Sequence, residues 1–417
     1  KLPQTLTQPI TAMIQKMQTQ ISLAITNRIL SPKGGLLLFL LSLFIFYFLV
    51  PLSAFSFSKP LDEYPLLSTL TLASILSILI GYYTFKATST SNLKPTGAPA
   101  KNAHLIPLNF HFVHGSIWAV FISFSIFTLI TAPSIPFISA LQGADAATLS
   151  EERGAFLKGR EGGAIAILYL NTILTNTLVP YSMVSLFNER SKWRYVSAVL
   201  FFAYCISFMQ KALFLNLALP LLAYMAHARR LNARVLFAAL SLSIATLITA
   251  TALSYSGSEP PSTSITDDYL TARHQPASAF DYVVWRALAV PIFTAVDTLV
   301  VHKEQFSAEP MLGATSSLLS LLFGIERINL ERYVFEHQFG SWNETANSNA
   351  VFLTDAYVNF GWIGVFIFSI ACGCAYALMQ KTHDVGLRCL WPIFAFGLFS
   401  SSLIGTLFSN GFILVFF

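Results

Sequence analysis

Charged residues are scarce in this chain. Asp, Glu, Lys and Arg make up 11% of its 417 residues, whereas about 25% is usual in a soluble globular domain. Hydrophobic residues make up 54% of the chain. This composition excludes an ordinary water-soluble domain, and we expect no nucleic-acid partner. It predicts an all-α, polytopic membrane protein that contacts the lipid bilayer.

Motifs for nucleotides and metals are also missing. The sequence contains no Walker motif, no GxGxxG, no HExxH and no Cys/His spacing typical of a metal site. The few cysteines all fall in apolar runs, which favours packing roles over a disulfide framework. They are Cys205, Cys372, Cys374 and Cys389. We therefore expect no cofactor and no bound divalent metal.

Several apolar runs reach the ~20 residues that cross a bilayer. The predicted spans lie near residues 35–56, 65–86, 109–133, 163–187, 195–210, 212–226, 234–255, 350–379 and 388–406. A final half or whole span, Leu407 to Phe417, gives about ten in all. The predicted regions are a cytoplasmic N-terminal segment (1–34), the first spans (35–255), a large outer loop (256–349) and the C-terminal spans (350–417).

The N-terminal segment carries apolar residues at helical spacing over residues 8–30. Either a helix lying on the membrane surface or an ordinary helix packed on the rest of the protein explains this pattern.

Basic residues indicate the orientation of the spans, because inner loops are enriched in Lys and Arg. With the N-terminus inside, most of the 25 Lys and Arg residues fall in inner segments, whereas only Glu189 and Asp384 of the 20 acidic residues do. We thus expect the loops Pro133–Gly162 and Ser256–Asn349 on the outer side.

Two outer cations stand in apolar surroundings. Lys211 separates two apolar runs, and Arg286 lies inside the apolar stretch Tyr282–Val301. A cation in such a place normally has an anionic partner. For Arg286 this partner is either Asp297, on the same helical face, or a bound anion.

Two further helices are expected in the large outer loop. We interpret Tyr282–Val301 as a re-entrant or interfacial helix rather than a span, because Pro291 is expected to break it. Met311 to Ile325 has the pattern of a short amphipathic helix over the membrane.

The stretch Asn343 to Ile370 starts polar and becomes a membrane helix. The spacing of Ser348, Asp355 and Asn359 places them on one face of a helix. An acid at the mouth of a span is costly to hold in lipid, so this face is expected to line a wet cavity, interpreted as the active site. Asp355 is the first candidate for a catalytic base, and His337 is the second.

Three local patterns follow one another on the outer side. They are Lys158-Gly-Arg-Glu-Gly-Gly163 leading into a span, Gln210-Lys211-Ala212 at a helical hairpin, and Ala346-Asn-Ser-Asn, Asp355, Tyr357 and Phe360-Gly361 opening a late span. With the large outer loop that carries Arg286, their order resembles the Wzy-type polymerases of O-antigen and oligosaccharide repeat units. That family often has Glu where this chain has Asp355.

The resemblance implies a GT-C-like glycosyltransferase of the bacterial inner membrane, with its active site facing the periplasm. Its substrate would be glycan repeat units on undecaprenyl pyrophosphate. The growing chain would move from its lipid carrier onto a new lipid-linked unit, to make O-antigen for lipopolysaccharide or another surface polysaccharide. A regulator of polysaccharide chain length is a candidate partner.

The residue chemistry agrees with such a donor, because fixed cations stabilise a pyrophosphate leaving group. We assign this role to Arg160, Lys211, Arg273 and Arg286. Arg286 also joins Asp355 and His337 in the catalytic set, and the expected ligands of sugar hydroxyls are Asn347, Asn349, Tyr357 and Asn359.

Two other activities remain open, as does a purely structural role as a membrane partner without enzymatic activity. A ligase of lipid-linked glycans has the same donor and membrane layout but a different acceptor. A transporter or channel would use Asp355 and the outer cations for a solute.

Overall fold

The computed structural model describes residues 27–54, 63–91, 109–144, 148–149, 152, 165–208, 211–228, 241, 269–276, 278–341 and 346–416. Within these ranges the chain forms helices and turns and no β-strand. Five of the described helices are long and apolar enough to cross a membrane: Pro32–Ser53, Glu63–Thr88, Phe110–Thr131, Phe280–Gln305 and Phe352–Lys381. This agrees with the predicted class, an all-α membrane protein.

Other predicted spans correspond to shorter or composite helices. The first is the continuous series α2 (Pro32–Phe44), η1 (Ile45–Leu49) and α3 (Val50–Ala54). After α5 (Phe110–Thr131) and α6 (Pro136–Leu141) come α8 (Ile165–Ile173), η3 (Leu174–Leu178), α9 (Val179–Asn188), α10 (Arg194–Phe208) and α11 (Lys211–His227). The predicted span at 234–255 and most of the N-terminal amphipathic segment lie outside the described residues.

The predicted span at 388–406 is divided. α17 (Val385–Arg388) and α18 (Trp391–Ser400) precede an extended residue at Ser401, and η4 (Gly405–Ser409) and α19 (Ile413–Phe416) follow. The apolar run therefore forms short pieces rather than one rod.

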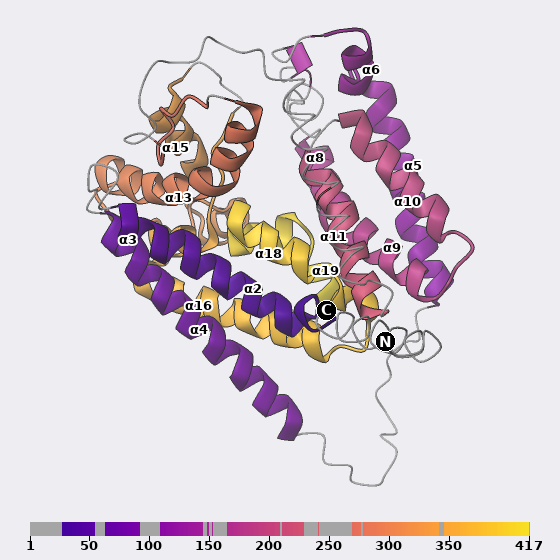
Figure 1. The fold of residues 1–417 in the computed structure, drawn as a ribbon, viewed down its shortest axis with the longest axis horizontal. Coiled ribbons are helices and arrows are strands. Elements are labelled where there is room, and N and C mark those ends of the chain that lie inside the picture. Colours follow the sequence, from indigo (N-terminus) through magenta and orange to yellow (C-terminus); the bar gives the residue numbers. More distant parts are fainter. Residues whose placement is uncertain are drawn as a thin grey trace, which may run out of the picture.

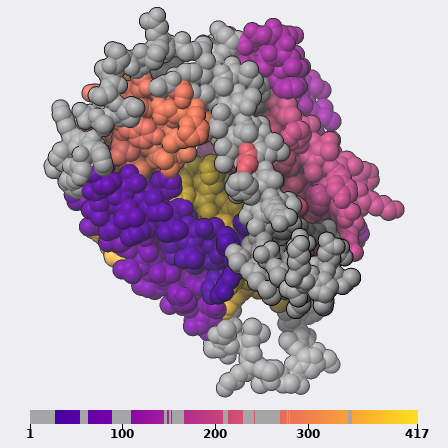
Figure 2. Space-filling view, viewed as in Figure 1, coloured from indigo at the N-terminus to yellow at the C-terminus, as the bar shows by residue number. Residues whose placement is uncertain are grey.

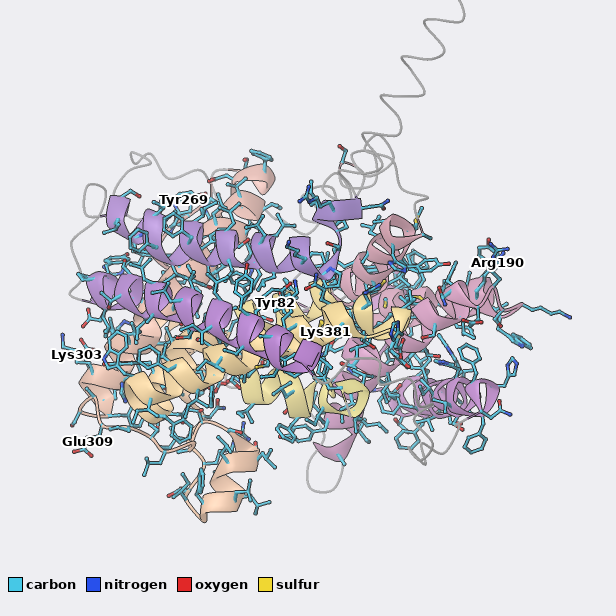
Figure 3. The ribbon with its side chains drawn as sticks, turned by 90° about the horizontal axis from the view of Figure 1, so that it is seen from below. Tyr82, Arg190, Tyr269, Lys303, Glu309 and Lys381 are labelled. Atoms are coloured by element: carbon cyan, nitrogen blue, oxygen red, sulfur yellow. The ribbon has the colours of Figure 1, made fainter. Side chains whose placement is uncertain are left out.

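α4 (Glu63–Ser91) and α16 (Phe352–Lys381) lie side by side (Figures 1 and 3). A Cβ atom on Gly81 would lie 2.2 Å from the carbonyl oxygen of Ile370, so only glycine permits this approach of the two backbones. At the far end of the pair, Lys381 Nζ donates a hydrogen bond of 2.7 Å to the carbonyl oxygen of Lys86. Apolar residues of α2 and α18 complete this core.

α13 (Ala279–Gln305), α14 (Ser317–Phe323) and α15 (Leu330–Phe339) gather at one end of the α4–α16 pair (Figure 1). Their orange surface adjoins the indigo surface of the first helices in Figure 2. Lys303 on α13 forms a 2.8 Å ion pair with Glu63 at the start of α4. In Figure 3, Lys303 and Glu309 lie at the end of the molecule opposite Arg190.

The predicted break at Pro291 is wrong, because the 27-residue helix α13 continues through it. By length and composition this helix can cross a membrane, whereas a re-entrant or interfacial helix was predicted. Ser278 caps this helix by accepting a hydrogen bond from the Asp281 backbone N–H at 3.1 Å. A proline removes one helical hydrogen bond, but Ala289, Ile292 and Phe293 around it are buried. Packing on both sides of the proline therefore compensates for the lost hydrogen bond, and the helix remains continuous.

The predicted helix from Met311 to Ile325 is shorter than expected. Ser316 accepts a hydrogen bond from the Leu319 N–H at 3.5 Å, so α14 starts only at Ser317, and it ends at Gly324 in a left-handed conformation. Leu321 and Leu322 on this helix are 81% and 69% exposed. The residues before Ser317 form a loop that bonds to α16 instead.

A polar cluster lies in the other half of the molecule, where η3 contacts α11 and the turn after η4. Asn216 donates to the Asn176 side-chain oxygen at 2.6 Å, and Asn176 donates to that of Asn410 at 2.9 Å. Thr177 donates to the Asn410 carbonyl oxygen at 2.6 Å. We refer to Asn176, Asn216 and Asn410 as the amide network; it ties three distant parts of the chain together.

Candidate functional site

The site is built on a sharp bend in α16. Gly361 has φ 60° and ψ −150°, which is not helical and is accessible to glycine with little strain. The carbonyl oxygens shortly before the bend also bond to residues outside the helix. Those of Val358 and Asn359 accept hydrogen bonds from the N–H groups of Met311 at 3.0 Å and Leu312 at 2.8 Å. The bend therefore anchors the loop 306–316 against the first turns of α16.

Asp355 is held by this loop and by its own helix. The Thr315 hydroxyl donates to Asp355 Oδ1 at 2.8 Å. Asn359 Nδ2 lies 3.2 Å from the same oxygen and 2.7 Å from Thr315 Oγ1. The Asn359 side-chain oxygen accepts from the Gly313 N–H at 3.0 Å. Both polar atoms of the Asn359 amide are thus occupied by internal partners.

The expectation that Asp355, Asn359 and Ser348 share one helical face holds for the first two only. α16 begins at Phe352, so Ser348 precedes the helix. Its hydroxyl donates instead to Gln338 Oε1 at 2.6 Å. The helix starts later than predicted because the backbone at Ser348 already bonds to the Glu331 carbonyl oxygen.

The expected wet cavity is also different. Asp355 is buried, with 6% of its surface exposed. It lines a cavity of about 10 Å³ between α13, α15 and the start of α16, which is room for roughly one water molecule. A sugar ring does not fit in a space of this volume.

Glu331 is a site residue that the sequence analysis missed. It lines the same cavity as Asp355, and the two carboxyl groups interact electrostatically. Burial raises the pKa of Glu331, against the opposing effects of a backbone hydrogen bond and of Arg327. The signal in the sequence was an acid at helical spacing with Leu330 and Val334, on the apolar face of a short helix.

Asp297 does not pair with Arg286. Its Oδ2 accepts a hydrogen bond of 2.7 Å from Gln338 Nε2, and Gln338 links onward to Ser348. Arg286 is exposed on the same helix and makes no ion pair with any residue that the structure describes. The internal pairing that offered the alternative explanation of Arg286 is therefore excluded for the described residues. Glu331 and Asp355, which line one cavity, are called the carboxyl cluster below.

The remaining predicted site residues are dispersed. His337 and Arg273 are exposed, and His337 does not line the cavity. Asn347 is exposed, Asn349 contributes to the cavity wall, and Tyr357 is half-buried. Arg160 lies outside the described residues; Lys211 is the first residue of α11, and its side chain is not described. The structure thus brings together Asp355, Asn359 and Asn349, and convergence of the cations stays a prediction.

Comparisons of the chain with protein-family models, curated proteins and solved structures found no match. Among the described residues, no three His, Cys, Asp or Glu side chains come together as a metal-binding group. The functional argument therefore rests on the carboxyl cluster and on the exposed arginines.

Proposed function

We propose that this protein is a glycosyltransferase that polymerises lipid-linked oligosaccharide repeat units. In this proposal about ten spans form a GT-C-like helical fold in the bacterial inner membrane. The active site faces the periplasm, and the growing glycan moves from undecaprenyl pyrophosphate onto the next lipid-linked unit. The observation that carries the proposal is that Arg286 is exposed and makes no ion pair with any described residue.

Arg286 sits on an apolar helix, exposed, while its expected partner Asp297 is bonded to Gln338. A guanidinium group binds two phosphate oxygens at once and keeps its charge at any physiological pH. As the glycosidic bond breaks, negative charge grows on the pyrophosphate, and a fixed cation stabilises that state more than the ground state. Arg273, exposed in the segment before α13, supports the same assignment.

Asp355 supplies the acceptor side of the reaction in this proposal. A carboxylate can orient the attacking hydroxyl group and take its proton. Thr315 and Asn359 fix the Asp355 side chain in place. Because the cavity has room for only about one water molecule, the proposal includes a rearrangement of its walls when a lipid-linked unit binds.

Transfer by the purified full chain in lipid nanodiscs tests the proposal, with undecaprenyl-pyrophosphate-linked repeat units from the host bacterium. Wild-type protein should lengthen the glycan one repeat unit at a time. Arg286→Ala should lower the rate by about 10²–10³, a typical effect of losing one group that stabilises developing charge. Arg286→Lys should also fail, because it keeps the charge but loses the fork of two N–H donors.

Arg190→Ala is the matched control, because Arg190 is an exposed arginine at the end of the molecule opposite Lys303, which lies on the same helix as Arg286 (Figure 3). A wild-type rate in Arg286→Ala would remove the pyrophosphate assignment. Deletion of the gene separates the competing activities. A polymerase deletion leaves single-unit glycans on lipid A, a ligase deletion leaves none, and unchanged surface glycans contradict both.

A further inference from the structure

The cavity beside Asp355 is small, and its surface is mainly apolar with a few polar groups. Its wall includes the side chains of Thr298 from α13, Glu331 from α15, and Thr354 and Asp355 from α16, with Asn349 from the segment before α16. A buried water needs two to four polar partners and a volume of about 10–15 Å³. The cavity volume of about 10 Å³ is at the lower end of this range, and the carboxyl groups of Glu331 and Asp355 are the candidate polar partners.

The Glu331 carboxyl group has an unsatisfied atom in this region. Its Oε2 is buried and has no hydrogen-bond partner among the described residues, although the side chain as a whole keeps some exposure. Asp355 Oδ1, in contrast, accepts from Thr315 and Asn359. An unsatisfied buried oxygen costs about 1–3 kcal/mol, so a partner in the cavity would stabilise the fold.

Two carboxylates beside one small cavity repel each other strongly when both are ionised. The raised pKa of Glu331 agrees with a proton retained on one of these two carboxyl groups. The other titratable groups packed around α15 are Asp297 on α13, Arg327 before α15, and Arg332, Glu336 and His337 on α15 itself. Of these, Arg332 is engaged by Glu336 at 2.7 Å.

We propose that this cavity is a buried proton site, in which one water molecule joins Glu331 to Asp355 and the two carboxyl groups hold a single proton between them. In the transfer, protonated Glu331 gives its proton to the water as the water gives one of its own to Asp355. Glu331 becomes the carboxylate and Asp355 the acid, and the net charge does not change. The site requires no glycan donor, so it stands independently of the proposed reaction.

If Asp355 is the base, Glu331 becomes the positioning residue that sets its protonation state. The stability of the protein should respond to pH in a defined direction. A carboxyl group whose pKa is raised on folding binds more protons in the folded state, so its contribution to stability falls as pH rises. That loss should begin above the ordinary glutamate value of about 4.3 and end above the raised pKa of the folded protein.

The test is an infrared pH titration of the full chain in nanodiscs, with thermal unfolding at each pH. The variants are Glu331→Gln, Asp355→Asn and the double variant. Glu336→Gln is the control, because Glu336 lies on the same helix and pairs with Arg332. Wild-type protein should show the band of a protonated carboxyl at neutral pH, shifted in D₂O.

Each single variant should move the titration midpoint of the remaining carboxyl down by about one pH unit or more, the coupling expected of groups that share a proton. The double variant should abolish the band, and its effect on unfolding should differ from the sum of the single effects. Glu336→Gln should leave the midpoint in place. The proposal fails if Glu331→Gln behaves like Glu336→Gln, or if the two single effects are simply additive.

Discussion

The carboxyl cluster and the amide network are both polar groups enclosed by apolar helices, but their hydrogen bonds differ in what they leave unpaired. In the amide network, Asn216 donates to Asn176 and Asn176 donates to Asn410. Each bond joins a neutral donor to a neutral acceptor, and no residue in the chain of bonds changes charge with pH. In the carboxyl cluster, Glu331 Oε2 remains unpaired among the described residues.

This difference indicates different roles. A neutral, internally satisfied network stabilises helix contacts and costs nothing when pH changes. Buried ionisable groups are expensive in a membrane protein and are usually retained for function. Substitutions in the carboxyl cluster should therefore change the rate of the proposed glycan transfer, whereas substitutions in the amide network should change the stability of the protein.

The largest expected effect comes from removing the Asp355 carboxylate. Asp355→Asn keeps the shape of the side chain and an oxygen that accepts from Thr315, but it cannot take a proton. Loss of a general base typically lowers the rate by 10²–10⁴, so glycan transfer per folded protein should fall by about that factor. Initial transfer rates in nanodiscs, normalised to folded protein, measure it.

Glu309→Gln is the control for this prediction, because Glu309 is an exposed acid in the loop 306–316, which also holds Thr315, the hydrogen-bond donor to Asp355. It should keep the wild-type rate. If both Asp355→Asn and Glu309→Gln keep the wild-type rate, the carboxyl cluster has no part in catalysis. The functional difference drawn here between the carboxyl cluster and the amide network is then wrong.

The sequence predicted the helical membrane class and picked out Asp355 and Asn359, because both depend on patterns along one stretch of chain. Apolar runs predict spans, and the spacing of the two residues is read within one helix. It missed Glu331, whose role depends on contact between α15 and α16. It also left Asp297 open as a partner of Arg286, because helical spacing cannot show that Gln338 on another helix bonds to this carboxylate.

The start of α16 was misplaced for a similar reason. Sequence periodicity continued the helix back to Ser348, whereas the backbone there bonds to Glu331. In the sequence, the bend at Gly361 appears only as a glycine in an apolar run. Its positive φ, and the bonds from the loop 306–316 to the carbonyl oxygens just before it, are seen only in the structure. Contacts between distant segments decided each of these outcomes.

A smaller effect, on stability alone, is expected from the amide network. Asn176→Ala removes the two hydrogen bonds to Asn216 and Asn410. Side-chain hydrogen bonds between membrane helices contribute about 0.6 kcal/mol on average and up to ~1.7 kcal/mol, so we expect a loss of about 1–3 kcal/mol. Denaturant unfolding in detergent measures the loss.

The rate of transfer per folded molecule should stay unchanged in Asn176→Ala. Asn188→Ala is the control, since the exposed Asn188 side chain bonds only to the adjacent Glu189 among described partners, and it should leave stability within about 0.5 kcal/mol of wild type. A large fall in rate for Asn176→Ala at normal stability would assign the amide network a functional role instead.

The smallest effect concerns the hydroxyl group that connects the loop 306–316 to Asp355. Thr315→Val keeps the volume of the side chain but removes its bond to Asp355 Oδ1 and its acceptor for Asn359. Asn359 Nδ2 still donates to the Asp355 carbonyl oxygen at 2.8 Å, so stability should fall by only about 1 kcal/mol.

Thr128→Val is the matched control, because the buried hydroxyl of Thr128 bonds within its own helix to the Ser125 carbonyl oxygen, and this variant should be nearly neutral. Equal unfolding midpoints for the two variants would mean that Thr315 does not hold Asp355, and that the backbone bonds from Met311 and Leu312 alone fix the loop on α16.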